Sequence, residues 1–564
     1  MSRLFDELLR VREFDESFLN PSYEDCWSAE LMPDMAKAVA RIKLAAQRGE
    51  KVLIYGDYDV DGVTASTVMH DTLRLAGVKE IDVMLPNRFL DGYGMSKKVI
   101  QRVEELGVNL VVTVDCGSRN HEIIADLEKK GVEVIVTDHH ECGETLPGAV
   151  AVVNPKRGDA LECAREVMKV VKMATEGSRR PREEREIERA VGELRELAGA
   201  GVAFKVAQGL VEAGLIAAGQ EKWLLDLVLI GTVCDSMRMT GENRRLCYYG
   251  MKVLAKTRRP GLKELMRVAG TKRIGGEVIG FQLGPRLNAA GRMETAEHAL
   301  RLLMAESRTE AASLALILNR LNEQRRGQQV EATIEIEERG VGEEPVIVVE
   351  GKWHEGVLGI IAGKLVEEYK RPAFVLSETD GVLKGSGRSF GEFNLAEALS
   401  VCGEYIIGGG GHAEACGLKV EKERLEDFRR AVNAYYQDLG LVEQERFLRV
   451  HEDLATREFE DLSLELLEEL RKLEPFGEGN AEPVFLLKEV RVVEASKMGA
   501  EGEHLRLVVW DQQGKSMKLV RFRAPEEYLK LRGGETVNVW TQLVENEFRG
   551  IRSVEGRILK LAVL

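Results

Sequence analysis

The sequence has no apolar run that approaches the roughly 20 residues needed for a membrane-spanning helix. Its first residues, 1–12, have no apolar core of the kind that signal peptides carry. The eight cysteines are scattered and form no Cys-x-x-Cys pair, which indicates neither a zinc site nor a disulfide framework. These absences predict a cytoplasmic protein with reduced thiols and no membrane association.

An excess of basic charge is also missing. The formal net charge of -15 argues mildly against a protein coated in nucleic acid, because Lys and Arg drive phosphate binding by displacing counterions. The segment 484–564 nevertheless contains more Lys and Arg than Asp and Glu, so the acidic excess lies before it. This distribution fits metal-binding acids in the main body and a basic domain at the end of the chain.

Several apolar runs stop at acidic or imidazole side chains. The runs 51–55, 110–114 and 134–137 have the length and composition of strands buried on both faces of a parallel sheet. A fourth run, 227–233, lies in a region that is expected to be largely helical, 197–316. The residues that follow these runs are Asp57, Asp59 and Asp61, then Asp115, then Asp138, His139 and His140, and finally Asp235.

One such ending, the Asp138-His139-His140 tripeptide, would by itself be read as a polar turn. Four endings together indicate a metal site, because the carboxyl ends of parallel strands meet at one edge of a sheet. Gathered carboxylates repel one another unless a cation lies between them. Oxygen ligands with one or two imidazoles suit Mn²⁺ or Mg²⁺ better than zinc.

Two divalent ions held in this way activate water and stabilise both oxygens of an in-line phosphoryl displacement. The sequence has no Walker loop, no Gly-x-Ser-x-Gly turn and no plausible cysteine nucleophile that would indicate another chemistry. Hydrolysis of a phosphate ester is therefore the favoured class of reaction.

The expected fold is α/β with about three or four domains, since 564 residues are too many for one core. Alternating strand and helix patterns predict a parallel-sheet domain, followed by a long helix, a smaller α/β domain and a C-terminal β-barrel. The first 47 residues are expected to form an extended arm and a helix. The predicted parts are 1–306 with a charged insertion at 158–196, the connecting helix 307–343, the second domain 344–439 and the barrel domain 440–564.

Glycine-rich segments at 385–389 and 408–412 are predicted to be loops that hold a phosphate beside Arg388 and His412. In the last domain, about five short strands with basic and aromatic residues are typical of an OB fold that binds single strands. The alternative, that these aromatic residues belong to the core of the barrel, is about as well supported for any one of them.

The motifs GDYDVDG at 56–62, VDCG at 114–117, TDHH at 137–140 and GTVCD at 231–235 together resemble the DHH phosphoesterase superfamily. Within it the chain is similar to the RecJ-type exonucleases that act on single strands. Further matching strings cover most of the chain: RFLDGYG at 88–94, LAGAGVAF at 197–204, GPRLNAAGR at 284–292 and EPFGEGNAEPVF at 474–485.

The resemblance implies a 5′-to-3′ exonuclease that uses two Mn²⁺ or Mg²⁺ ions and releases mononucleotides from single-stranded DNA during recombination and repair. It also implies a monomer whose partners are a single-strand-binding protein and a RecQ-type helicase. The implied metal ligands are Asp59, Asp61, Asp115, His139 and Asp235, with Asp57 as a ligand or a partner of one. His140, together with Asp138, is the implied catalytic group, which polarises the scissile phosphate or assists proton transfer.

The resemblance also assigns substrate-binding residues. Arg88, Arg286, Ser386 and Arg388 would hold the 5′ phosphate and its neighbour, and Tyr93 would pack on the terminal base. A planar guanidinium binds phosphate with two parallel hydrogen bonds, which suits this role. The remaining residues implied to line this cleft are Asn288, Gly410, Gly411 and His412.

Three other functions are weighed against this one. A phosphodiesterase for short oligonucleotides or cyclic dinucleotides should lack the barrel and the EPFGEGN string, and an inorganic pyrophosphatase should lack the GGGGHAEACG string. A non-catalytic replication scaffold should have lost its acidic residues. All of these features are present, so the sequence favours the exonuclease.

Overall fold

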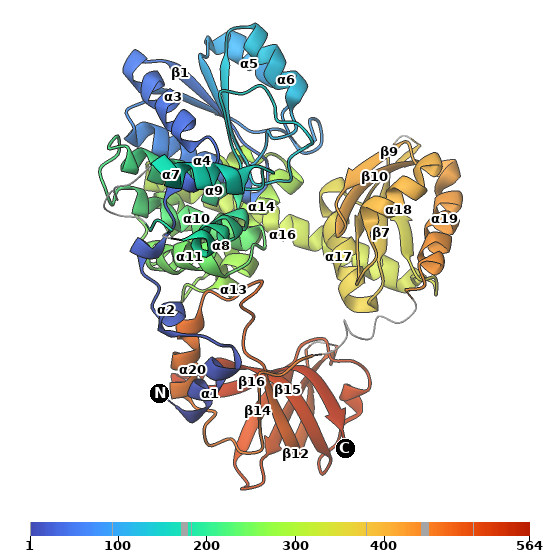
Figure 1. Cartoon of the computed structure of the whole chain (residues 1–564). Helices are drawn as coiled ribbons and strands as arrows, with labels where there is room; N and C mark the ends of the chain where they lie inside the picture. Colours follow the sequence, from blue (N-terminus) through green and yellow to red (C-terminus); the bar gives the residue numbers. More distant parts are fainter. Residues whose placement is uncertain are drawn as a thin grey trace.

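The computed structural model describes residues 2–92, 94–170, 179–181, 183–379, 381–441, 450–499 and 501–564. Tyr93 and parts of the predicted insertion and barrel domain, 171–178 and 442–449, lie outside the described residues. Three bodies are visible: an α/β body at the top, a second α/β body joined to it by helix α16, and a barrel below both (Figure 1).

The first body is built on a five-stranded sheet with the order β2-β1-β3-β4-β5, in which every neighbouring pair is parallel. Alternate residues of β1 face opposite sides: Val52 and Ile54 belong to one core cluster, and Leu53 and Tyr55 to another. Burial on both faces explains the uninterrupted apolar runs. The strands are β1 (Lys51–Tyr55), β2 (Glu80–Met84), β3 (Leu110–Val114), β4 (Glu133–Thr137) and β5 (Ala151–Val153).

Helices cover both faces of this sheet and continue into a helical layer below it. The fourth apolar run lies in α10, which is buried on all sides and therefore shows no amphipathic period. The helices are α3 (Met35–Arg48), α4 (Val60–Leu75), α5 (Lys98–Leu106), α6 (His121–Lys129), α7 (Ala160–Val170), α8 (Glu184–Arg195), α9 (Gly199–Glu212), α10 (Leu225–Cys234), α11 (Gly241–Leu254), α12 (Pro260–Ala269), α13 (Gly276–Val278), the π-helix η4 (Ile279–Leu283), α14 (Gly284–Met293), α15 (Glu297–Met304) and α16 (Arg308–Arg339).

The charged insertion contains two helices, α7 and α8, and α8 is not solvated on all sides. Helix α8 buries Ile187, Ala190, Val191 and Leu194, because these residues recur at helical spacing and pack against the main core. The residues between these two helices lie mostly outside the described ranges.

The second body has a sheet of order β6-β7-β8-β10-β9, in which only β6 and β7 are parallel. The glycine-rich segments predicted as loops are strands, and that prediction was wrong. A Cβ on Gly385 would lie 2.7 Å from Leu376 Cγ, so glycine is required by close packing within the sheet. The elements are β6 (Ile347–Gly351), α17 (Leu358–Tyr369), β7 (Ala373–Thr379), β8 (Val382–Arg388), α18 (Leu395–Val401), β9 (Gly408–Gly411), β10 (Ala415–Glu421) and α19 (Leu425–Asp438).

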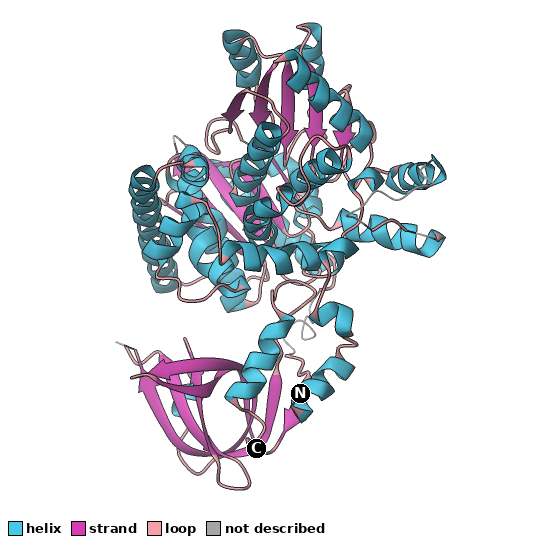
Figure 2. Cartoon of the chain, turned by 90° about the vertical axis from the view of Figure 1, so that its left-hand side faces the viewer, coloured by secondary structure: helices cyan, strands magenta, loops and turns pink. Residues whose placement is uncertain are grey.

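The third body is a five-stranded barrel that closes where β12 pairs with β15, and β11 extends its edge (Figure 2). The predicted arm was wrong in part, because residues 3–11 form a helix whose Leu4, Phe5 and Leu8 join the barrel's core. The elements are α1 (Arg3–Val11), α2 (Glu16–Leu19), β11 (Leu454–Thr456), α20 (Leu464–Leu470), β12 (Phe485–Met498), β13 (His504–Trp510), β14 (Ser516–Arg521), β15 (Thr536–Phe548) and β16 (Ile551–Val563). None of the helices in the described ranges has the length and apolarity to cross a bilayer.

Candidate active site

Acidic side chains from three strand ends and one helix end converge below the first sheet. Three groups of residues could each hold a metal ion, because the possible ligand atoms within each group all lie within 4.8 Å of one another. Asp115 belongs to two of these groups and His139 to two, so the three groups form one continuous cluster. The groups are Asp57, Asp59 and Asp115; Asp61, His139 and Asp235; and Asp115, His139 and His140.

His139 lies in the middle of the acids. Its Nε2 is 3.0 Å from Asp115 Oδ1, 3.6 Å from Asp235 Oδ2 and 3.8 Å from Asp61 Oδ2. Burial lowers the pKa of His139 to about 3, so the ring is neutral and its nitrogen lone pair is available to a metal ion. The three groups together contain every residue that was predicted as a metal ligand.

Asp61 is fixed by the amino terminus of α9. Its Oδ2 accepts a hydrogen bond from Gly199 N at 2.5 Å and its Oδ1 accepts one from Ala200 N at 3.0 Å. The unpaired N–H groups and the positive end of a helix favour a carboxylate at this position. A Cβ on Gly199 would lie 2.6 Å from Asp115 Cβ, which explains why glycine begins this helix.

The cluster carries more negative charge than its own hydrogen bonds can stabilise. Burial, followed by repulsion from neighbouring carboxylates, raises the pKa of Asp61 to about 7 and that of Asp235 to about 9. Among the described groups, Asp57 Oδ1 is buried and has no hydrogen-bond partner. Asp115 adopts a left-handed backbone with φ of 60°. A buried, oxygen-rich donor set with neutral imidazole fits Mn²⁺ or Mg²⁺.

Asp138 is not among the three groups of possible ligands, and it holds the two histidines in place. Its Oδ1 accepts hydrogen bonds from His139 N at 2.8 Å and His140 N at 3.1 Å and is 2.9 Å from His140 Nδ1, while its Oδ2 accepts one from Ser118 N at 3.0 Å. Although burial raises the pKa of Asp138, its bond to His140 and the nearby imidazoles lower it to about 2. Burial lowers the pKa of His140, but the bond to Asp138 and the charges around it raise it overall.

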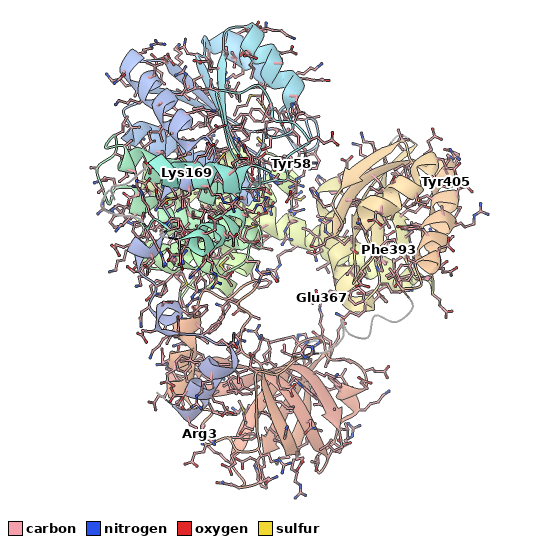
Figure 3. The ribbon with its side chains drawn as sticks, viewed as in Figure 1. Arg3, Tyr58, Lys169, Glu367, Phe393 and Tyr405 are labelled. Atoms are coloured by element: carbon pink, nitrogen blue, oxygen red, sulfur yellow. The ribbon has the colours of Figure 1, made fainter. Side chains whose placement is uncertain are left out.

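Guanidinium groups approach the acid cluster from the side of the second body. Arg88 lies 4.1 Å above the ring of Tyr58, which is on the face of the first body turned toward the second (Figure 3). Arg388 Nη1 donates to Ser386 Oγ at 3.0 Å, and Arg292 Nη1 donates to Gly356 O at 3.3 Å. Burial, then the charges of Arg88 and Arg388, lower the pKa of Arg292 to about 9.

These arginines have no carboxylate partner in the described parts of the chain, since none of the ion pairs there includes Arg88, Arg292 or Arg388. A Cβ on Gly359, in the first turn of α17, would lie 2.8 Å from Arg388 Nη2 and 3.1 Å from Ser386 Oγ. The first turn of a helix, a hydroxyl and unpaired guanidinium groups together form a surface that attracts phosphate.

The remaining predicted residues differ in their position. Arg286 and Asn288 lie on α14, and Asn288 lines a cleft of about 1000 Å³ that extends from Arg292 to β15 and β16 of the barrel. Gly410 is in strand register with Gly417, and Gly417 with Ser386, so Gly410 lies two strands from Ser386 on the exposed edge of the sheet. Gly411 ends that edge strand, and His412 follows it and is exposed. Tyr93 is outside the described residues.

Sequence reasoning missed Arg292 and the anchoring of Asp61 by α9. The signal for Arg292 was present, because it ends the GPRLNAAGR string from which only Arg286 and Asn288 were selected. The signal for the anchor was Gly199, a glycine at a helix start where a side chain would collide with Asp115.

Comparisons with known proteins identify the family of the chain. The chain matches the DHH family N-terminal domain over residues 51–232, the DHHA1 domain over 343–438 and the RecJ OB domain over 455–560. It is 34% identical to the single-stranded-DNA-specific exonuclease RecJ of Bacillus subtilis (strain 168), over 99% of this chain and 68% of that protein. It is 32% identical to the exonuclease of the same name from Escherichia coli (strain K12), over 92% and 88%.

Solved structures match as well. RecJ from Thermus thermophilus in complex with Mn²⁺ has a TM-score of 0.77 and 27% identity, covering 100% of this chain and 76% of that one. The complex of RecJ with Mg²⁺ from the same organism has a TM-score of 0.72 and 26% identity, covering 100% and 74%. Because the three family models cover all three bodies, and relatives at 32–34% identity match over more than nine tenths of this chain, the chain belongs to the RecJ family of DHH phosphoesterases, which are nucleases.

Proposed function

We propose that this protein is an exonuclease that degrades single-stranded DNA from its 5′ end to mononucleotides, with a role in recombination and repair. The observation that carries the proposal is that two unneutralised clusters, one acidic and one basic, lie close enough for their charges to interact. Buried carboxylates on one side have raised pKa values, and arginines on the other side, within the described residues, have no carboxylate partner. Divalent cations and a phosphodiester together neutralise both sides.

We propose that Asp59, Asp61, Asp115, His139 and Asp235 hold two divalent ions, with Asp57 as a ligand or a partner of a ligand. When bound, Mn²⁺ or Mg²⁺ supplies a nucleophile from water and stabilises charge on the scissile phosphate. Asp138 orients His140 through its Nδ1, which places the imidazole at the edge of the cluster to polarise a phosphate oxygen or move a proton. Asp138 itself is a positioning residue, since both of its oxygens are occupied by main-chain and imidazole donors.

We propose that the strand runs from the second body toward the barrel, with its 5′ end at the second body. Arg88, Ser386 and Arg388, beside the first turn of α17, are proposed to hold the 5′ phosphate. Arg286 and Asn288 on α14 are proposed to contact the next phosphate. The cleft continues from there toward the barrel, so the remaining strand leaves on that side. We propose that Tyr93 packs on the terminal base and that Gly410, Gly411 and His412 line the substrate site from the second body.

The barrel supports binding of single strands, because it is a closed OB-type barrel and one end of the cleft reaches it. We further propose that the protein acts as a cytoplasmic monomer beside a single-strand-binding protein and a RecQ-type helicase. The partners are those that the family suggests, and the eight free cysteines fit a reducing compartment.

The test is digestion of a single-stranded 30-mer labelled at either its 5′ or its 3′ end, with Mn²⁺, Mg²⁺ or EDTA, beside Asp115→Ala. We expect the 5′ label to appear at once as a mononucleotide while the 3′-labelled strand shortens gradually, and EDTA and Asp115→Ala to abolish both. Cleavage restricted to strands of a few nucleotides would favour an oligonucleotide phosphodiesterase. No metal-dependent cleavage would indicate a non-catalytic scaffold.

A further inference from the structure

An exposed aromatic ring projects into the cleft between the first body and the barrel. Phe281 is 79% exposed, although it lies in the π-helix η4 between two residues, Ile279 and Leu283, that are fully buried. π-Helical turns are rare in proteins, and those that occur are often located at functional sites. The ring lines the cleft of about 1000 Å³ that also contains Asn288, Arg292 and Ser236. Neither the metal cluster nor the barrel's core uses this side chain.

The π-helix is fixed relative to the metal cluster. A Cβ on Gly284, the residue after η4, would lie 2.5 Å from Cys234 Sγ, which shows how closely this turn packs on the end of α10. Cys234 immediately precedes Asp235, so the same helix end that supplies a proposed metal ligand also supports the turn that carries Phe281. The distance from the reacting phosphate to the ring is therefore set by rigid packing.

A cation without a carboxylate partner lines the same cleft. Arg325, on α16, donates from Nε and Nη2 to Asn322 Oδ1 and, like Arg326, forms no ion pair within the described ranges. Arg286 Nη1 donates to Gln282 O at 2.8 Å, so a third guanidinium lies directly beside the residue that follows Phe281. Guanidinium groups and an exposed ring in one cleft are the two components that bind single strands: charge for the phosphates and a platform for the bases.

We propose that Phe281 and Arg325 form a nucleotide subsite on the 3′ side of the scissile bond, in which Phe281 stacks on a base and Arg325 binds a phosphate. The proposal rests on the proposed function, because the strand must enter with its 5′ end at Arg388. A base stacked on Phe281 is turned out of any double helix, since a paired base has neighbours on both faces. The subsite therefore selects unpaired nucleotides beyond the one being released.

The experiment measures the first cleavage of 5′-phosphorylated single-stranded 12-mers that carry a 3′ label and one abasic residue at successive positions, with Mn²⁺. For the wild-type protein we expect one position near the 5′ end where loss of the base raises KM roughly tenfold, the factor expected for one stacked base. Phe281→Ala should raise KM by a similar factor on unmodified DNA and remove the abasic effect at that position. Phe281→Trp should keep both properties.

Two further variants separate stacking from general effects. Arg325→Gln should raise KM at every base sequence and reduce the slope of log KM against log salt by about one, as expected for one lost phosphate contact. Leu316→Ala is the control, because Leu316 is 58% exposed on the same helix as Arg325 and does not line the cleft. It should behave as the wild type.

If Phe281→Ala keeps the wild-type abasic profile, the subsite is refuted while the exonuclease function stands. If the wild-type protein does not shorten the 12-mers at all, both the proposed function and the subsite are refuted.

Discussion

Metal ions should stabilise this protein by an amount that grows with pH. In the folded chain, the pKa of Asp61 is about 7 instead of 3.8, and that of Asp235 is about 9. A carboxyl group with a raised folded-state pKa stabilises the fold while it is protonated, and this stabilisation is lost as pH rises through the folded-state value. Without metal, stability should therefore fall between pH 5 and pH 9.

The size of the effect follows from these shifts. A difference of about 3 pKa units at Asp61 corresponds to about 4 kcal/mol when the group is fully ionised. A divalent ion at about 100 times its dissociation constant contributes about 2.7 kcal/mol in return. At roughly 2–4 °C per kcal/mol for a domain of this size, saturating Mn²⁺ should raise the unfolding midpoint by about 5–10 °C at pH 8.5. At pH 6 the shift should be less than half as large, because protons compete for the same oxygens.

The assay is thermal unfolding followed by circular dichroism, in EDTA and in Mn²⁺, at pH 6 and pH 8.5. Asp115→Asn is the informative variant, because it removes one of the repelling charges and one shared ligand. It should raise the midpoint in EDTA at pH 8.5 and abolish the response to Mn²⁺. Equal midpoints with and without Mn²⁺ at pH 8.5, or a lower midpoint for Asp115→Asn in EDTA, would refute the reasoning.

Three further predictions concern single positions. Asp138→Asn should lower kcat by roughly 10- to 100-fold with the fold intact, because the imidazole it orients loses a charged partner; unchanged steady-state kinetics would contradict this role. Gly199→Ala should raise the Mn²⁺ concentration needed for half-maximal activity at least about tenfold, since its Cβ would collide with Asp115. The control is Gly192→Ala, whose Cβ would have nothing within 4 Å, and its Mn²⁺ titration should match that of the wild type. Arg292→Gln should reduce the preference for 5′-phosphorylated over 5′-hydroxyl ends, measured as the ratio of kcat/KM, and a constant ratio would show that Arg292 does not bind the terminal phosphate.

The sheet of the first body could be predicted because burial on both faces leaves a plain signature. The predicted runs 110–114 and 51–55 are the strands β3 and β1 with the same bounds. Helix α16 was equally predictable, since Ser307 caps it and accepts a hydrogen bond from Glu310 N. Short-range chemistry decides all of these elements, so a single sequence is enough.

The errors occurred where distant contacts decide the structure. The glycines at 385–387 and 408–411 indicate turns by local preference, but they form strands because both segments pair with β10. Neighbouring side chains then leave no room for a Cβ at Gly385 and Gly387. Residues 3–11 carry an amphipathic pattern whose partner, the core of the barrel, begins more than 400 residues later. The prediction of an extended arm did not take this distant partner into account.

The charge of the site explains how an acidic protein can bind nucleic acid. Outside the cleft, arginines are commonly neutralised: Arg41, for example, lies 2.6 Å from Glu50 and 2.7 Å from Glu133. At the site, burial and the charge of a neighbouring acid raise the pKa of Asp57, and the charge of Arg88 acts in the opposite direction. No ion pair joins Arg88 to Asp57 among the described residues. A direct ion pair would neutralise the negative charge that attracts the metal ions and the positive charge that attracts the phosphate. Because the fold keeps the acidic cluster and the arginines apart, metal ions and a phosphodiester together neutralise both. The net charge of the chain has little influence on this local attraction.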